Sequence, residues 1–194
     1  MKFLDTILKF FVGDKSKKDI KEIQPIVDKI KKLEPKIASL SLDELREKSN
    51  TFRQAIKDAQ KDIQAEIQSL QQQADTTTNI DEKETLYKQI DDLRDKSYAE
   101  EKKALDEILP EAFAVIKETA KRFAENETLE VTATAFDREL SGSNDYVTIE
   151  DDKAIWKNSW KAAGSEVTWN MVHYDVQLIG GVALHQGNAT EMQT

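Results

Sequence analysis

Apolar side chains recur at helical spacing along the first forty residues, in two successive patterns. The first pattern carries Phe3, Leu4, Ile7, Leu8 and Phe11, and the second carries Ile20, Ile23, Val27, Ile30 and Leu33. Gly13 is expected to end the first helix. In the second helix, Pro25 is expected to produce a kink or to mark a first turn, and Pro35 to close the helix.

Residues 41–108 predict a long antiparallel helical hairpin. Ser41-Leu-Asp-Glu44 is a capping box, and the apolar positions after it keep helical spacings to about residue 73. Polar residues then interrupt the pattern, and Asn79 begins another cap signal. A second long helix carries Leu86, Ile90, Leu93, Leu105 and Ile108. Two long helices joined by a short polar turn are typical of such a hairpin, and its narrow apolar seam and many charges lead us to expect that it projects into solvent.

The pattern changes again beyond the hairpin. Pro110 fits the first turn of a new helix. Residues 128–167 contain a predicted β-hairpin, in which Tyr146–Ile149 and Ala154–Trp156 flank a charged turn. We expect the tryptophans of this region to anchor the inserted segment to the body of the protein, with a binding face as the alternative: Trp156, Trp160 and Trp169.

The last predicted helix begins at Thr168, which can serve as its N-cap, and Gly187 is expected to end it. Its apolar positions are Met171, Tyr174, Leu178, Val182 and Leu184. Residues 188–192 are expected to form a short strand.

Composition excludes several kinds of site and partner. The 194-residue chain has no cysteine, which rules out disulfides, thiolate metal sites and a cysteine nucleophile. It has only two histidines, and we predict no metal site. The net charge of −9 argues against specific nucleic-acid binding. No apolar run approaches the length of about 18 residues that a membrane-spanning helix needs.

The charge is unevenly distributed. Residues 1–40 hold ten lysines and six acidic residues, a balance of +4, and the remaining 154 residues therefore carry −13. A basic amphipathic front end on an acidic body favours contact of residues 2–18 with anionic phospholipid; the alternative is a helix docked on its own domain. Asp5 and Lys9 interrupt the apolar run, and no small-residue cleavage site follows, so we expect no signal peptide and a cytoplasmic location.

The most informative stretch is Met171-Val-His-Tyr-Asp-Val-Gln177-Leu-Ile-Gly-Gly181, followed by Ala189-Thr-Glu-Met-Gln-Thr194. It resembles the SecA family of ATPase motors, in which a helix reading H-F-D-V-Q-L-x-G-G precedes a strand reading I-A-E-M-x-T and then the phosphate-binding loop G-E-G-K-T. Further segments match the family in the same order: Leu33-Glu-Pro35, Leu42-Asp-Glu-Leu45, Ile108-Leu-Pro-Glu-Ala-Phe-Ala-Val-Ile116 and Lys121-Arg122. The chain ends at Thr194, one residue before the expected position of that loop.

The resemblance implies a mainly α-helical fold with a small β component. It combines the long antiparallel helical hairpin, an inserted β-hairpin and the start of a P-loop (RecA-like) nucleotide-binding domain. The implied organisation begins with the N-terminal helices, residues 1–40, and the hairpin, residues 41–108, which includes an insertion at about 58–107. A helix of the nucleotide-binding domain follows at 109–127, and then the inserted segment at 128–167. Residues 168–194 form the adenine-site helix and the first strand of that domain. Most family members lack both insertions.

Gln177 is the expected adenine reader. A glutamine amide can pair with adenine N6–H and N7, whereas guanine offers acceptors at both equivalent positions. On a helix, Tyr174 and Gln177 would share a face and Met171 would lie one turn further back, so that an aromatic ring and a thioether could sandwich the purine. The alternative is that Met171 and Tyr174 are core residues and Gln177 is a surface amide. His173 and Asp175 are expected to be structural.

The resemblance further implies an ATPase that uses ATP with Mg²⁺ to move preproteins with signal sequences through the SecYEG channel, peripherally associated with the inner membrane. A homodimer is left open. We expect no catalytic residue within these 194 residues, and no activity from them alone, because they lack the phosphate-binding loop. The alternative function is a non-enzymatic helical-hairpin scaffold or a membrane-surface interaction module.

Overall fold

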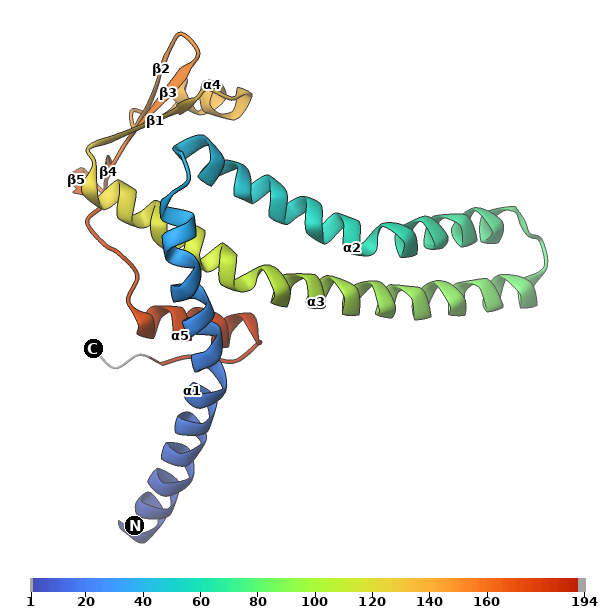
Figure 1. The fold of residues 1–194 in the computed structure, drawn as a ribbon. Helices are drawn as coiled ribbons and strands as arrows, with labels where there is room; N and C mark the ends of the chain where they lie inside the picture. Colours follow the sequence, from blue (N-terminus) through green and yellow to red (C-terminus); the bar gives the residue numbers. More distant parts are fainter. Residues whose placement is uncertain (1, 192–194) are drawn as a thin grey trace. The chain divides into compact units, whose positions relative to one another are not determined.

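The computed structural model describes residues 2–191, with side chains from Lys18 onward (Figure 1). Its elements are α1 (Lys2–Ala38), α2 (Leu42–Thr76), α3 (Ile80–Glu125), β1 (Thr128–Thr132), α4 (Ala135–Ser141), β2 (Val147–Glu150), β3 (Lys153–Lys157), β4 (Ser159–Ala162), β5 (Ser165–Thr168) and α5 (Asp175–His185). The protein is thus mainly helical with a small antiparallel β component. It divides into two compact units, unit 1 with residues up to Leu45 and from Phe113 onward, and unit 2 with Arg46–Ala112.

Helix α1 is a single continuous helix, so two of the predicted boundaries are wrong. It continues through Gly13 and contains both Pro25 and Pro35 in its interior. A buried apolar face explains why the prolines do not end it: Ile23, Val27, Ile30 and Ile37 are all buried. Packing of this stripe outweighs the cost of about 3 kcal/mol that an interior proline imposes.

In unit 2, α2 and α3 run side by side in opposite directions and are joined by residues 77–79 (Figure 1). Their seam is apolar, with Ile67, Ile90 and Leu93 buried against one another. A polar contact extends this seam: Gln64 donates through Nε2 to the Oγ of the buried Ser97 at 2.9 Å. Both predicted caps are confirmed: the Ser41–Glu44 capping box precedes α2, and Asn79 Oδ1 accepts from the first turn of α3.

Helix α3 passes through Pro110 without interruption, so the prediction of a new helix at this residue is wrong. The buried residues Ala104, Ala114 and Val115 lie on both sides of the proline and keep the helix packed. One helix therefore contributes to both units.

The segment between α3 and α5 contains the predicted β-hairpin, formed by β2 and β3, and more. Strand β1 pairs with the other edge of β3, giving an antiparallel sheet of order β1-β3-β2, and β4 pairs with β5 in a separate two-stranded ribbon. Between β1 and β2, α4 begins with a capping box in which the buried Asp137 accepts from Thr134. The sequence patterns predicted neither β1, α4 nor the ribbon.

The tryptophans of this segment have different surroundings. Trp169 donates through Nε1 to the carbonyl oxygen of Ala120 in α3 at 3.0 Å, which confirms the predicted anchoring for this residue. Asn158, beside Trp169 at the same end of the ribbon, donates to the carbonyl of Phe123 at 3.1 Å. Trp156 instead lies beside Tyr146 in the sheet, and Trp160 is exposed on the ribbon.

Helix α5 begins later than predicted. Thr168 ends β5, and Tyr174 is the N-cap of the helix. Gly187, with φ of 79°, follows its end. Residues 188–191 form no strand, and the rest of the predicted strand lies outside the described residues.

Candidate adenine-binding turn and its surroundings

The three residues expected to contact adenine come together at the start of α5, but not on one helical face. Gln177 lies in the first turn of α5, whereas Met171 and Tyr174 precede the helix. The Gln177 side chain joins them: its Oε1 accepts from the backbone N–H of Tyr174 at 2.9 Å, and its Nε2 lies 3.9 Å from Met171 Sδ. The prediction that these residues share one helical face is therefore wrong. The capping turn before α5 nevertheless brings the three side chains close together.

Exposure bears on the alternative that Met171 and Tyr174 are core residues. Tyr174 is 73% exposed and Met171 is 37% exposed, so neither is a core residue. A carboxamide has two acceptor positions and two N–H donors. After the contacts to Tyr174 and Met171, Gln177 keeps one acceptor position and one N–H donor. Adenine requires one donor for its N7 and one acceptor for its N6–H.

Asp175, between Tyr174 and Gln177, pairs with a lysine of α1 rather than with a histidine. Its Oδ2 lies 2.8 Å from Lys31 Nζ. This hydrogen-bonded ion pair lowers the pKa of the Asp175 carboxyl and raises the pKa of Lys31. His173 Nδ1 is buried and has no hydrogen-bond partner among the described residues. The Lys31 contact ties Asp175 to α1; a structural role for His173 stays a prediction.

Gly181 allows α5 to approach α3 closely. A Cβ atom at this position would lie 2.7 Å from Cε1 and Cζ of Phe113. Gly181, the second residue of the Gly180-Gly181 pair, thus permits close helix packing. This is the role expected for a glycine pair that lacks a dinucleotide-binding fingerprint. Leu178 and Val182, on the same helix, are buried.

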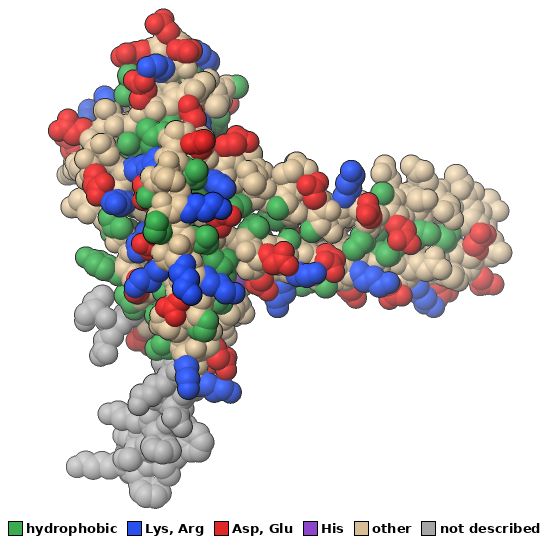
Figure 2. All heavy atoms as spheres, in the orientation of Figure 1, with side chains coloured by type: hydrophobic (Ala, Val, Ile, Leu, Met, Phe, Trp, Pro, Cys, Tyr) green, Lys and Arg blue, Asp and Glu red, His purple; other side chains and the backbone are tan. Residues whose placement is uncertain are grey.

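A second feature is a basic face on α1. Five exposed lysines fall on it at helical spacing: Lys18, Lys21, Lys29, Lys32 and Lys36. Basic side chains gather along the described part of this helix in Figure 2. The face lies away from the buried stripe that includes Val27 and Ile30.

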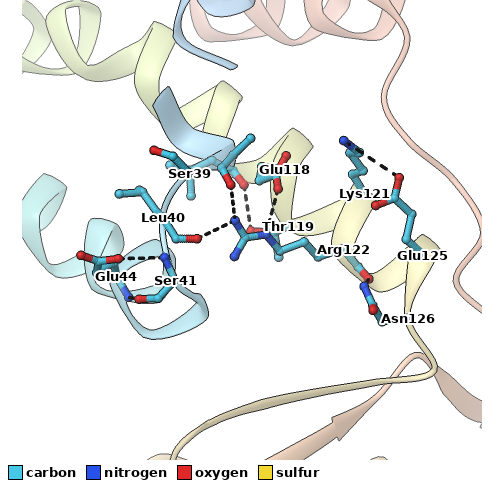
Figure 3. A network of polar contacts seen from close by, with 12 residues as sticks. Ser39, Leu40, Ser41, Glu44, Glu118, Thr119, Lys121, Arg122, Glu125 and Asn126 are labelled. Carbon is cyan, nitrogen blue, oxygen red and sulfur yellow. Dashed lines mark hydrogen bonds and ion pairs between the residues drawn. The ribbon is translucent and has the colours of Figure 1, made fainter. Parts of the chain in front are cut away.

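Arg122 fastens the turn between α1 and α2 (Figure 3). Its guanidinium donates to the carbonyl oxygen of Leu40 at 2.7 Å, to that of Ala38 at 3.2 Å and to Glu118 at 2.8 Å. Asp43 ties the same region to β1 by accepting from the backbone N–H and hydroxyl of Thr132. In the Lys121-Arg122 segment, which resembles the family, the arginine thus acts as a structural clamp between α3 and the turn after α1.

The described residues contain no group of three or more histidine, aspartate and glutamate side chains that could hold a metal ion. Nor is any described helix long and apolar enough to cross a membrane. The chain also contains no G-x-x-x-x-G-K-[ST] sequence.

Comparison with known proteins gives consistent matches. The model of the SecA DEAD-like domain matches residues 8–194. Proteins named protein translocase subunit SecA are similar over the whole chain, with 59% identity in Christiangramia forsetii, 55% in Flavobacterium psychrophilum and 50% in Phocaeicola vulgatus. The chain spans only 17 to 18% of the length of these relatives. No solved structure gives a significant match.

Proposed function

The chain belongs to the SecA DEAD-like domain family, and from this premise we propose that it is the N-terminal part of a motor that couples ATP hydrolysis to preprotein translocation through the SecYEG channel. Its relatives are named as translocase subunits, and they extend well beyond the region matched here. The cargo would be preproteins with signal sequences.

The observation that carries the proposal is the turn at the start of α5. Gln177 presents one free acceptor position and one N–H beside the exposed Tyr174 and Met171. Adenine pairs with such an amide through N6–H and N7, and the ring and thioether suit the purine faces. Bound ATP with Mg²⁺ would supply the phosphoryl-transfer chemistry; these residues would hold and select its base.

The phosphate contacts and the Mg²⁺ ligands would come from a longer protein, since a P-loop sequence is absent from these 194 residues. We therefore expect the chain alone to hydrolyse no ATP and to show no nucleotide affinity of its own, because backbone amides and a lysine around the phosphates supply most of the affinity.

The two segments that interrupt the family pattern, at about 58–107 and 128–167, are proposed insertions into this motor. The first falls largely within unit 2, which is compact by itself. The second is fastened to α3 by Asn158 and Trp169. Both can thus be added without disturbing the turn that holds Gln177.

We also propose peripheral association with the inner membrane through anionic phospholipid. Residues 2–18 supply apolar and basic side chains, and the lysine face from Lys18 to Lys36 continues the basic character along the same helix. A basic helix face is attracted to anionic headgroups.

The test uses the full-length parent protein with inverted membrane vesicles that contain the SecYEG channel. ATP-dependent protection of a preprotein from protease is the measured quantity. Gln177→Ala is expected to slow protection at limiting ATP, whereas Gln186→Ala, an exposed glutamine at the other end of α5, is not. No ATP-dependent protection with the unmodified protein would contradict the proposal and would favour a helical-hairpin scaffold or a membrane-surface module.

A further inference from the structure

Asp175 occupies a critical position in the proposed adenine-binding turn. It is the first residue of α5, directly after the N-cap Tyr174 and two residues before Gln177. Its partner Lys31 belongs to α1, 144 residues away in the chain. The neighbouring Ile30 is fully buried, so the lysine extends from a well-packed part of that helix.

The first turn of a helix is its least constrained part, because its N–H groups lack partners within the helix. In α5 the cap is supplied by Gln177 itself, whose Oε1 accepts from the N–H of Tyr174. Gln177 would therefore have two tasks, capping the turn and contacting the base. If it were the only group holding the turn, the position of the turn would depend on whether the base is bound. A second attachment, independent of Gln177, is needed to keep the amide in place.

The ion pair between Lys31 and Asp175 is such an attachment in the first turn itself, beside the buried Leu178 of the same helix. Nearby, Lys117 of α3 pairs with Glu34 of α1 at 2.7 Å, so charges of both signs from three helices surround the turn. Lys31, and more weakly Lys117, lower the pKa of the Asp175 carboxyl.

We propose that Lys31 and Asp175 form a positioning pair that fixes the first turn of α5 against α1, so that the Gln177 amide is aimed at adenine. This inference rests on the proposed function, because it assigns Gln177 to base recognition. Neither member of the pair contacts the base; both act through Gln177.

The test measures the dissociation constants of ATP and GTP for the full-length parent protein. Lys31→Met and Asp175→Asn are each expected to weaken ATP binding about two- to fivefold, the range for loss of a half-exposed ion pair, and to leave GTP binding unchanged. The double variant is expected to be no weaker than either single variant, because both remove the same contact. Lys31→Arg, which keeps the pair, is expected to retain the ATP preference.

Lys32→Met is the matched control. This exposed neighbouring lysine has no hydrogen bond or ion pair in the described part of the chain, so its loss should leave both constants unchanged. The thermal midpoint of each variant separates a general loss of stability from a loss of base preference.

Gln177→Ala serves as the reference variant. If it lowers the preference for ATP while Lys31→Met and Asp175→Asn do not, the positioning pair is refuted and the adenine assignment stands. If Gln177→Ala leaves the preference unchanged, the adenine assignment and the positioning pair both fail. Equal weakening of ATP and GTP in the Lys31 and Asp175 variants would mean a structural role only and would overturn the inference.

Discussion

Arg122→Ala is expected to destabilise unit 1 by about 3 kcal/mol, far more than most single substitutions. The side chain is only 14% exposed, and it satisfies carbonyl groups at the end of α1 and in the turn before α2. Ala38 is the last residue of α1, so its carbonyl has no partner within the helix, and Leu40 lies in the turn between α1 and α2. The guanidinium therefore helps to close α1, together with the Leu40 N–H on Ile37 O and the Ser39 hydroxyl on Lys36 O.

The magnitude follows from the contacts. The short bond to Leu40 O is charge-assisted and contributes roughly 1.5 kcal/mol, and the longer bond to Ala38 O about a third of that. Glu118, with a side chain 13% exposed, would lose its cation and remain partly buried, which costs roughly 1 kcal/mol more. Arg122→Lys should recover only part of the loss, because an ammonium lacks the planar fork that reaches the carbonyls through Nη2 and Glu118 through Nε.

Denaturant unfolding of the chain followed by tryptophan fluorescence measures this effect, because all three tryptophans lie in unit 1. Lys121→Ala is the control: this lysine pairs with Glu125 at 4.0 Å and both side chains are largely exposed, so its loss should cost less than about 0.5 kcal/mol. If Arg122→Ala is no more destabilising than Lys121→Ala, the clamp contributes nothing and the reasoning is wrong.

Three further predictions concern the framework. Gly181→Ala should destabilise unit 1 by roughly 1–2 kcal/mol in denaturant unfolding, because its Cβ would overlap the Phe113 ring; Phe113→Leu in the same chain should relieve the effect, and additive losses would contradict the packing argument. The Ser41 N–H lowers the pKa of Glu44, so this group stabilises the fold above its usual pKa and the gain is lost as pH falls through the lowered value; Glu44→Gln should flatten that acid limb of a stability–pH curve, and an unchanged limb would refute the capping role. Deleting about 60–106 and bridging the gap should leave a cooperative fluorescence transition, since the deletion lies within unit 2; a broad transition would show that this region supports unit 1.

Periodicity was sufficient to predict the long helices, but not where they end. Gly13, Pro35 and Pro110 are unfavourable inside helices, and each was expected to mark a boundary. The helices continue through all three residues. At Pro35 and Pro110, buried residues on both sides, such as Ile37 beyond Pro35, keep the helix packed. Local propensity cannot anticipate this, since the compensating contacts come from distant segments.

The β segments differ in how visible they are in the sequence. Strand β1 has alternating exposure, with Leu129 buried, and its period of two could have been recognised. The ribbon of β4 and β5 has no buried face, so no apolar alternation marks it.

The start of α5 carries a capping signal in its sequence. Thr168 is a favourable N-cap residue, but Gln177 three residues after Tyr174 has the spacing of the acceptor in a capping box, and the structure uses it as such. The Lys31–Asp175 pair had no comparable signal, because a single sequence does not show which charges meet across 144 residues.

The most direct test of the central claim, that the start of α5 recognises adenine, is the ratio of ATP to GTP affinity in two variants of the full-length parent protein. Gln177→Ala should weaken ATP binding by a factor of roughly 5 to 150, the loss of a bidentate pair, and reduce the preference for ATP. Tyr174→Ala should weaken both nucleotides equally, because stacking does not distinguish purine edges. An unchanged ratio in Gln177→Ala together with a shifted ratio in Tyr174→Ala would contradict the roles assigned to these residues.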